Sequence, residues 1–105
     1  MSEHPGTPSG GIRAFLTAQR DEVLRIAARH GAHNVRVFGS VARGEDRGDS
    51  DVDLLVELAP GVTLLRHAAL VRELEALLGR KVDVVSERAL RPQLREDVLR
   101  EAVAV

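Results

Sequence analysis

The chain has 105 residues, of which 44% are hydrophobic and 30% are charged, and its formal net charge is −1. This size and composition predict one globular domain with a single modest core. The balanced charges exclude the dense basic surface of a protein that neutralises a nucleic-acid backbone. The absence of cysteine excludes disulfides and thiolate metal sites. No apolar run approaches the ~20 residues that cross a bilayer, so we expect a cytoplasmic protein that binds neither nucleic acid nor membrane directly.

The N-terminal half of the chain changes character several times. The first eleven residues are polar and rich in proline and glycine, and apolar residues then recur at helical spacing as far as the next glycine. In chain order we predict a flexible tail (1–11), a helix (12–30) ended by Gly31, a strand (34–38), a short helix (41–43) capped by Ser40, and a polar loop (44–50). Residues 12–105 are expected to form the single domain.

The C-terminal half begins with the clearest strand pattern. Val52, Leu54, Val56 and Leu58 share one face by the period of two, which leaves aspartates on the other face. In chain order we predict a strand (51–58), a helix (63–78) with apolar positions 64, 68, 71, 74 and 78 ended by Gly79, a strand (81–85), and a helix from 86 through Ala102 with Pro92 in a first turn. This alternation predicts an α/β (α+β) fold in which a small mixed sheet is flanked by helices.

Three aspartates on two predicted strands could hold a metal ion. Asp51 and Asp53 lie two residues apart, so their side chains share a face with about 6–7 Å between Cα atoms. Mg²⁺ prefers oxygen ligands and often takes only one or two carboxylates besides substrate phosphates. Asp83 lies between two valines on the next strand and would face the pair if the strands are neighbours in register. Three such carboxylates can hold two metal ions about 3.5–4 Å apart.

The corner after the first predicted strand suits a phosphate. Gly39 would let the backbone approach the anion, and the first-turn N–H groups and helix dipole would attract it. Ser40 would add a hydroxyl donor, and Arg43 is placed to reach a phosphate oxygen.

Each feature alone has a simpler explanation. Gly-Ser is a common turn, an Asp-x-Asp pair is often a solvated strand edge, and Asp83 alone would be an exposed strand residue. Their combination at this spacing favours metal-assisted phosphoryl or nucleotidyl transfer, because that chemistry needs a phosphate-binding turn and metal-binding carboxylates together.

The run from Phe38 to Val56 resembles the signature of the nucleotidyltransferase superfamily that includes DNA polymerase β-like enzymes. From about Ile12 to its end, the chain is similar to the minimal nucleotidyltransferase (MNT) family, prokaryotic proteins with little beyond the catalytic core. The resemblance implies a nucleotidyltransferase-like fold with phosphate binding by Gly39 and Ser40, metal binding by Asp51 and Asp53, and a third carboxylate at Asp83.

The resemblance also implies a partner and a reaction. Minimal members are typically encoded beside a HEPN-domain toxin, an all-helical ribonuclease, and transfer AMP from ATP to a tyrosine hydroxyl of that toxin. It therefore implies an adenylyltransferase antitoxin that uses two Mg²⁺ ions and ATP. From its position alone, Asp83 is also expected to help deprotonate the attacking hydroxyl.

Two other functions stay open at this point. The chain could be a binding antitoxin that covers its partner without catalysis, although three mutually repelling carboxylates would serve no purpose in a pure binder. It could also be a small-molecule nucleotidyltransferase of the aminoglycoside-modifying type that works as a homodimer. Chain length counts against that function, because little of the chain remains for an acceptor pocket.

Overall fold

The computed structural model describes residues 11–45 and 51–105, which form a four-stranded mixed sheet and its helices. The elements in chain order are α1 (Gly11–Ala18), α2 (Arg20–Arg29), β1 (Ala32–Phe38), α3 (Ser40–Arg43), β2 (Val52–Leu58), α4 (Leu64–Leu78), β3 (Val82–Ser86), the 3₁₀ turn η1 (Glu87–Ala89), α5 (Pro92–Glu101) and β4 (Val103–Ala104). The predicted fold class is confirmed. Of the predicted tail, only Gly11 belongs to the described residues, and of the predicted loop only Gly44 and Glu45 do.

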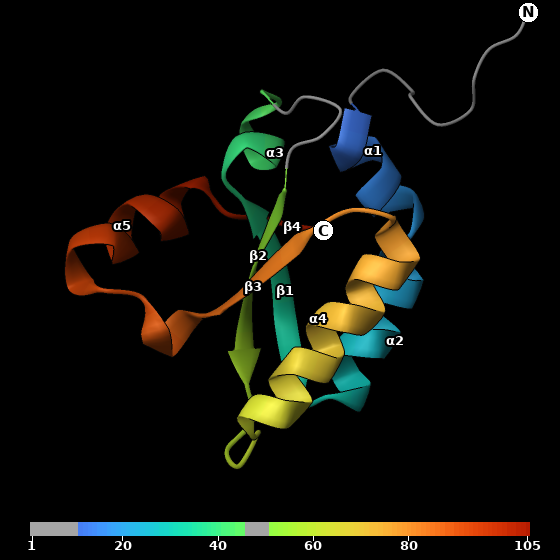
Figure 1. The fold of residues 1–105 in the computed structure, drawn as a ribbon. Helices are drawn as coiled ribbons and strands as arrows, with labels where there is room; N and C mark the ends of the chain where they lie inside the picture. The colour runs from blue at the N-terminus through green and yellow to red at the C-terminus, as the bar shows by residue number, and fades with distance from the viewer. Residues whose placement is uncertain (1–10, 46–50) are drawn as a thin grey trace, which may run out of the picture.

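The sheet has the strand order β3-β2-β1-β4, and α2 and α4 lie along one side of it (Figure 1). β2 is antiparallel to β1 and parallel to β3. Consequently the end of β1, the start of β2 and the start of β3 all lie at one end of the sheet, and this arrangement positions the candidate site.

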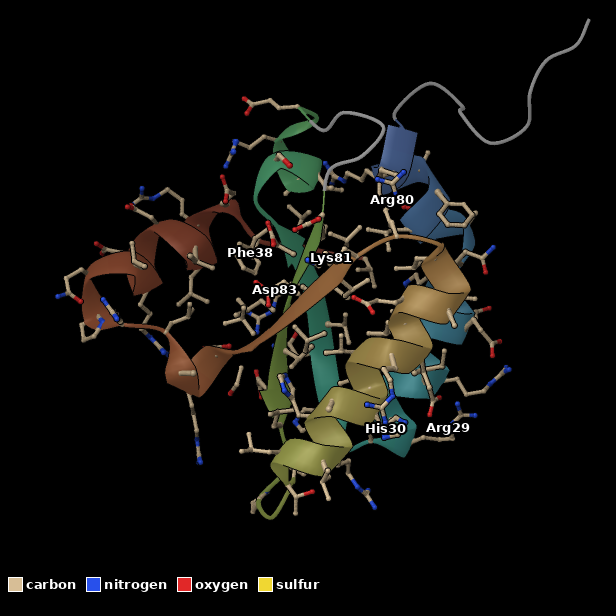
Figure 2. The ribbon with its side chains drawn as sticks, viewed as in Figure 1. Arg29, His30, Phe38, Arg80, Lys81 and Asp83 are labelled. Atoms are coloured by element: carbon tan, nitrogen blue, oxygen red, sulfur yellow. The ribbon has the colours of Figure 1, made fainter. Side chains whose placement is uncertain are left out.

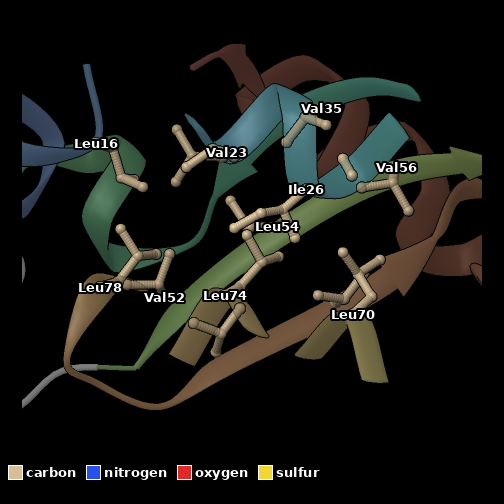
Figure 3. Close-up of a cluster of buried hydrophobic side chains, with 14 of the residues drawn as sticks. Leu16, Val23, Ile26, Val35, Val52, Leu54, Val56, Leu70, Leu74 and Leu78 are labelled. Atoms are coloured by element: carbon tan, nitrogen blue, oxygen red, sulfur yellow. The ribbon is translucent and has the colours of Figure 1, made fainter. Parts of the chain in front are cut away.

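The core lies between the sheet and these helices. Val52, Leu54 and Val56 of β2 are buried there, as the alternation predicts, and Figure 3 shows them among side chains from the helices. Leu55 is also fully buried although it points to the opposite face. β2 is therefore a strand covered on both faces, which makes it a rigid support for the residues at its start.

The predicted apolar face of α4 is confirmed at Leu74 and Leu78 but not at Leu64, and Leu70 belongs to it although it was not predicted. The buried residues of this helix are Leu70, Leu74 and Leu78, whereas Leu64 is 86% exposed. The helix begins one residue later than predicted because Thr63 is its N-cap, accepting a hydrogen bond from the backbone N–H of Arg66 at 3.1 Å. It ends before Gly79, as predicted.

The predicted first helix is wrong as a single element, because the chain bends at Gln19 between α1 and α2. No side chain between Leu16 and Val23 is buried, so packing does not require one straight helix across this stretch. The bend lets both helices direct apolar residues into the same core. The predicted stop at Gly31 is confirmed by its backbone φ of 77° directly after the last turn of α2.

Two other predictions were wrong in detail. Ser40 does not cap α3 but is its first residue, and Gly39 occupies the capping position without a side-chain bond. The last helix does not continue through Ala102: it ends at Glu101, and the chain then forms β4, which pairs antiparallel with β1. The strand forms because the outer edge of β1 offers unpaired backbone groups to an apolar segment.

Within the described ranges, no helix is long and apolar enough to span a membrane.

Removing core volume from α4 should destabilise the domain strongly. Leu74 is 1% exposed, so Leu74→Ala is expected to lower the free energy of unfolding by about 2–5 kcal/mol in urea titration, through lost burial and the cavity left behind. Leu64→Ala in the same helix is the matched control and should change stability by less than about 0.5 kcal/mol, because its side chain is already in solvent. Equal losses would contradict this assignment of the buried face.

Candidate active site

The three predicted carboxylates meet at one end of the sheet. Asp53 of β2 pairs with Phe38 of β1 on one side and with Asp83 of β3 on the other, so these three residues form a row across the strands. Asp51 directly precedes β2. Figure 2 shows Phe38 and Asp83 close together at the level of the sheet below α3. The structure thus places Asp83 beside the Asp51–Asp53 pair, as the neighbouring-strand argument requires.

Asp53 is the most constrained of the three side chains. Burial raises its pKa first, followed by repulsion from Asp83, Asp51 and Glu101, while Arg43 lowers it. When no cation is bound, the ionised carboxylates therefore repel one another. A bound cation would relieve this repulsion, which is the electrostatic condition expected of a metal site.

The carboxylates do not form a complete metal site by themselves. Among the residues that the structure describes, no group of three His, Asp or Glu side chains is arranged so as to hold a metal ion. The donor chemistry still fits Mg²⁺, which takes few protein carboxylates and completes its shell with water and substrate phosphates. Asp51, Asp53 and Asp83 are the residues that would hold it.

Gly39 makes the corner between β1 and α3 possible. Its backbone has φ 78° and ψ −155°, a region that is open to glycine almost alone. A Cβ atom built on Gly39 would lie 2.3 Å from Oδ2 of Asp53. Glycine is therefore required here because the turn passes directly against the Asp53 carboxylate. This is a second reason for glycine, in addition to the predicted approach of the backbone to a phosphate.

Arg43, predicted to reach a phosphate, already has two carboxylate partners. Its Nε donates to Glu45 at 2.9 Å and its Nη1 donates to Glu101 at 2.5 Å. These two bonds raise the pKa of Arg43. The pKa of Glu101 is lowered by the bond from Arg43 and by the backbone N–H of Gly39, which donates to Glu101 at 3.0 Å. Ser40 follows Gly39 at the start of α3, so the predicted phosphate corner is assembled in one place.

Glu101 is the residue of this site that sequence reasoning missed. It lies 58 residues after Arg43 in the chain, within the helix predicted from 86 through Ala102, and the sequence pattern predicted no functional role for it. The available signal was the short apolar segment Ala102–Val105, which is compatible with a returning strand but is too short to identify one. A strand there would have brought the preceding acidic residue to the sheet.

Four hollows of about 370 to 490 Å³ lie at a distance from the candidate site. They are lined by residues such as Leu58, Thr63 and Arg66, at the opposite end of β2 from Asp53.

Comparison with known proteins agrees with this geometry. Residues 20–105 match the family model of the nucleotidyltransferase domain. The chain is 43% identical over 94 residues to the protein adenylyltransferase MntA of Thermococcus cleftensis, covering 90% of this chain and 92% of the relative.

Solved structures show the same fold. A candidate minimal nucleotidyltransferase, 62% identical in sequence, superimposes with a TM-score of 0.80 over 88% of this chain and 94% of its own. An MNT antitoxin in complex with a tri-AMPylated HEPN toxin of Shewanella oneidensis gives a TM-score of 0.64 at 18% identity, over 84% of this chain and 69% of the other. The second likeness is one of fold alone.

A side chain at Gly39 should damage the site more than the same change at a neighbouring glycine. Gly39→Ala is expected to abolish nucleotidyl transfer and to lower the melting temperature, because the new methyl group collides with Asp53. Gly44→Ala is the matched control: Gly44 also has a positive φ, but an added Cβ would meet nothing within 4 Å. The control should lose only about 1–2 kcal/mol of stability and keep its activity. Loss of activity in both variants would contradict a specific role for the Gly39–Asp53 approach.

Neutralising Asp53 should stabilise the metal-free protein. Its pKa is raised by folding, so the folded state holds its proton more tightly and loses relative stability as the pH rises through that pKa. Asp53→Asn is therefore expected to melt at a higher temperature than the natural protein at pH 7 without metal. This advantage should shrink in acid, where the natural carboxyl is protonated. Asp97→Asn, at an exposed carboxylate paired with Arg100, is the control and should show no such gain.

Proposed function

This chain belongs to the nucleotidyltransferase domain family, in the minimal branch of MntA-type protein adenylyltransferases, and we propose that it transfers AMP from ATP to a tyrosine hydroxyl of a HEPN-domain toxin. The transfer silences the toxin, so the chain acts as its antitoxin. The proposal depends above all on one observation, the row in which Asp53 and Asp83 stand in register beside the Gly39 corner.

The division of the site into two parts supports this reaction. The Gly39–Ser40 corner and Arg43 would take the β- and γ-phosphates. Asp51, Asp53 and Asp83 would hold Mg²⁺, which when bound would supply positive charge to neutralise the phosphate oxygens. Repulsion among these carboxylates is unfavourable when no cation is bound. Their presence therefore fits a catalytic role better than a pure binding role.

In the proposed step the tyrosine oxygen forms a bond to the α-phosphorus of ATP. The bond from that phosphorus to the oxygen bridging to the β-phosphate breaks, and pyrophosphate leaves with the bonding electron pair. Asp83 accepts the proton of the hydroxyl as the new bond forms, a role for which its position on the outer strand next to Asp53 is suited. The products are the AMP-tyrosine ester, pyrophosphate and the proton.

The proposed partner, a HEPN-domain toxin, follows from the solved complexes whose fold this chain shares. The Shewanella oneidensis complex contains an MNT antitoxin together with a HEPN toxin that carries AMP groups, and another toxin–antitoxin structure of this fold contains the ATP analogue AMP-PNP. By analogy the acceptor of this chain is a protein that brings its own docking surface to the carboxylate end of the sheet.

Label transfer tests the proposal directly. The purified chain, Mg²⁺ and ATP labelled at the α-phosphate are mixed with the product of the adjacent gene, and label on that protein is measured. Asp51→Asn and Asp53→Asn should each lower the rate on the order of a thousandfold, since metal-ion stabilisation is worth several kcal/mol of barrier. Asp97→Asn should transfer at the natural rate because its carboxylate is exposed on α5.

The other possible functions give different results. ATP labelled at the γ-phosphate should leave no label on the acceptor, and label transfer from it would indicate a kinase. A stable complex that silences the toxin without any label would replace the proposal with a binding antitoxin. Transfer to an aminoglycoside but not to the protein would indicate the small-molecule enzyme.

A further inference from the structure

A single carboxylate joins the two parts of the phosphate corner. One oxygen of Glu101 accepts the backbone N–H of Gly39 at 3.0 Å, and the other accepts Nη1 of Arg43 at 2.5 Å. The side chain of Glu101 is only 26% exposed, whereas that of Arg43 is 46% exposed. Glu101 therefore fixes both the turn that approaches Asp53 and the guanidinium next to it.

The sheet, rather than helix α5, determines where Glu101 lies. β4 pairs antiparallel with β1, with Val103 opposite Val37, and the same register continued by two residues places Glu101 opposite Gly39. Helix α5 itself has no buried residue. The hydrogen bond from Gly39 to Glu101 thus extends the β1–β4 ladder by a side-chain contact.

In the part of the chain that the structure describes, few contacts hold Arg43 besides the one with Glu101. Arg43 is the last residue of a four-residue helix, and its other ionic partner, Glu45, is itself 64% exposed. A free arginine side chain loses rotamer entropy when it is immobilised. A carboxylate that already holds the guanidinium in place removes part of this loss when a phosphate binds.

We propose that Glu101 is a positioning residue for nucleotide binding: it holds the Gly39 turn and presents Arg43 to the triphosphate, without touching the reacting atoms itself. This inference rests on the proposed function, because it presumes a nucleotide at the Gly39 corner. It makes the short C-terminal strand part of the active site, since β4 sets the position of Glu101. The opposite arrangement, in which Glu101 occupies the place of a phosphate and competes with the nucleotide, predicts effects of the opposite sign.

The test is the affinity for AMP-PNP with Mg²⁺, measured by calorimetry on the natural chain and on Glu101→Gln. The glutamine carbonyl can still accept the Gly39 N–H, but its amide cannot accept the second bond from Arg43. We expect Kd for the analogue and KM for ATP to rise roughly tenfold, as for a lost charge-assisted contact, with kcat changed less than about twofold. Asp97→Asn, on the same helix, should leave both constants unchanged.

A double-mutant cycle shows whether Glu101 acts through Arg43. Arg43→Gln alone should raise Kd at least as much as Glu101→Gln. Adding Glu101→Gln to Arg43→Gln should then have little further effect. Glu101→Gln also removes the repulsion between Glu101 and Asp53. Because this happens both in the natural chain and in Arg43→Gln, it cancels when the two effects of Glu101→Gln on Kd are subtracted.

Several results would overturn the inference. Tighter nucleotide binding by Glu101→Gln would show competition instead of positioning, and an unchanged Kd with only a lower melting temperature would show a purely structural role. Additive effects in the cycle would exclude action through Arg43. If Glu101→Gln does not fold, an unchanged Kd in Arg43→Gln also overturns it. Failure of the natural chain to bind the analogue would instead contradict the proposed function on which the inference rests.

Discussion

The close approach of Gly39 to Asp53 is the constraint on which the rest of the site depends. The turn after β1 passes so near the Asp53 carboxylate that an added Cβ would lie 2.3 Å from its oxygen. This contact brings the predicted phosphate corner and the predicted metal ligands together without any intervening side chain. Asp53 also lies close to other carboxylates, and a bound cation would relieve the repulsion among them.

The domain tolerates this cluster because its stability is built elsewhere. The face of β2 opposite Asp53 is packed with Val52 and Leu54 against the helices, and Leu55 is buried on the face of Asp53 itself. Burial of this kind supplies most of the stability of a small domain. The strands are thus rigid supports, and the cost of the site is confined to their ends.

The C-terminal segment contributes in a different way. Helix α5 buries no residue, yet it is fastened at both ends by ion pairs: Glu87 of η1 with Arg36 and Arg95, and Glu101 with Arg43. The pair between Arg36 and Glu87 is well shielded, at 16% and 21% exposure. Specific charged contacts therefore fasten this helix, whereas the last strand is placed by its pairing with β1 and by the packing of Val103 and Val105 against the core.

Local patterns of residues were enough to predict several parts of this protein. The alternation around Leu54 predicted β2, the glycines at 31 and 79 predicted the helix ends, and the spacing of Gly39, Ser40, Asp51 and Asp53 predicted the chemistry. These features depend on backbone conformation and on which face a residue occupies, and both are encoded within a few residues.

The meeting of distant segments could not be predicted from local pattern. The register that sets Asp83 against Asp53, the position of Glu101 against Gly39, and the exposure of Leu64 depend on which strands pair and how the helices lie on the sheet. The same holds for β4, whose two residues carry too weak a local preference to identify a strand without the free edge of β1. Long-range pairing is selected by the packing of the whole core, so a local pattern does not contain it.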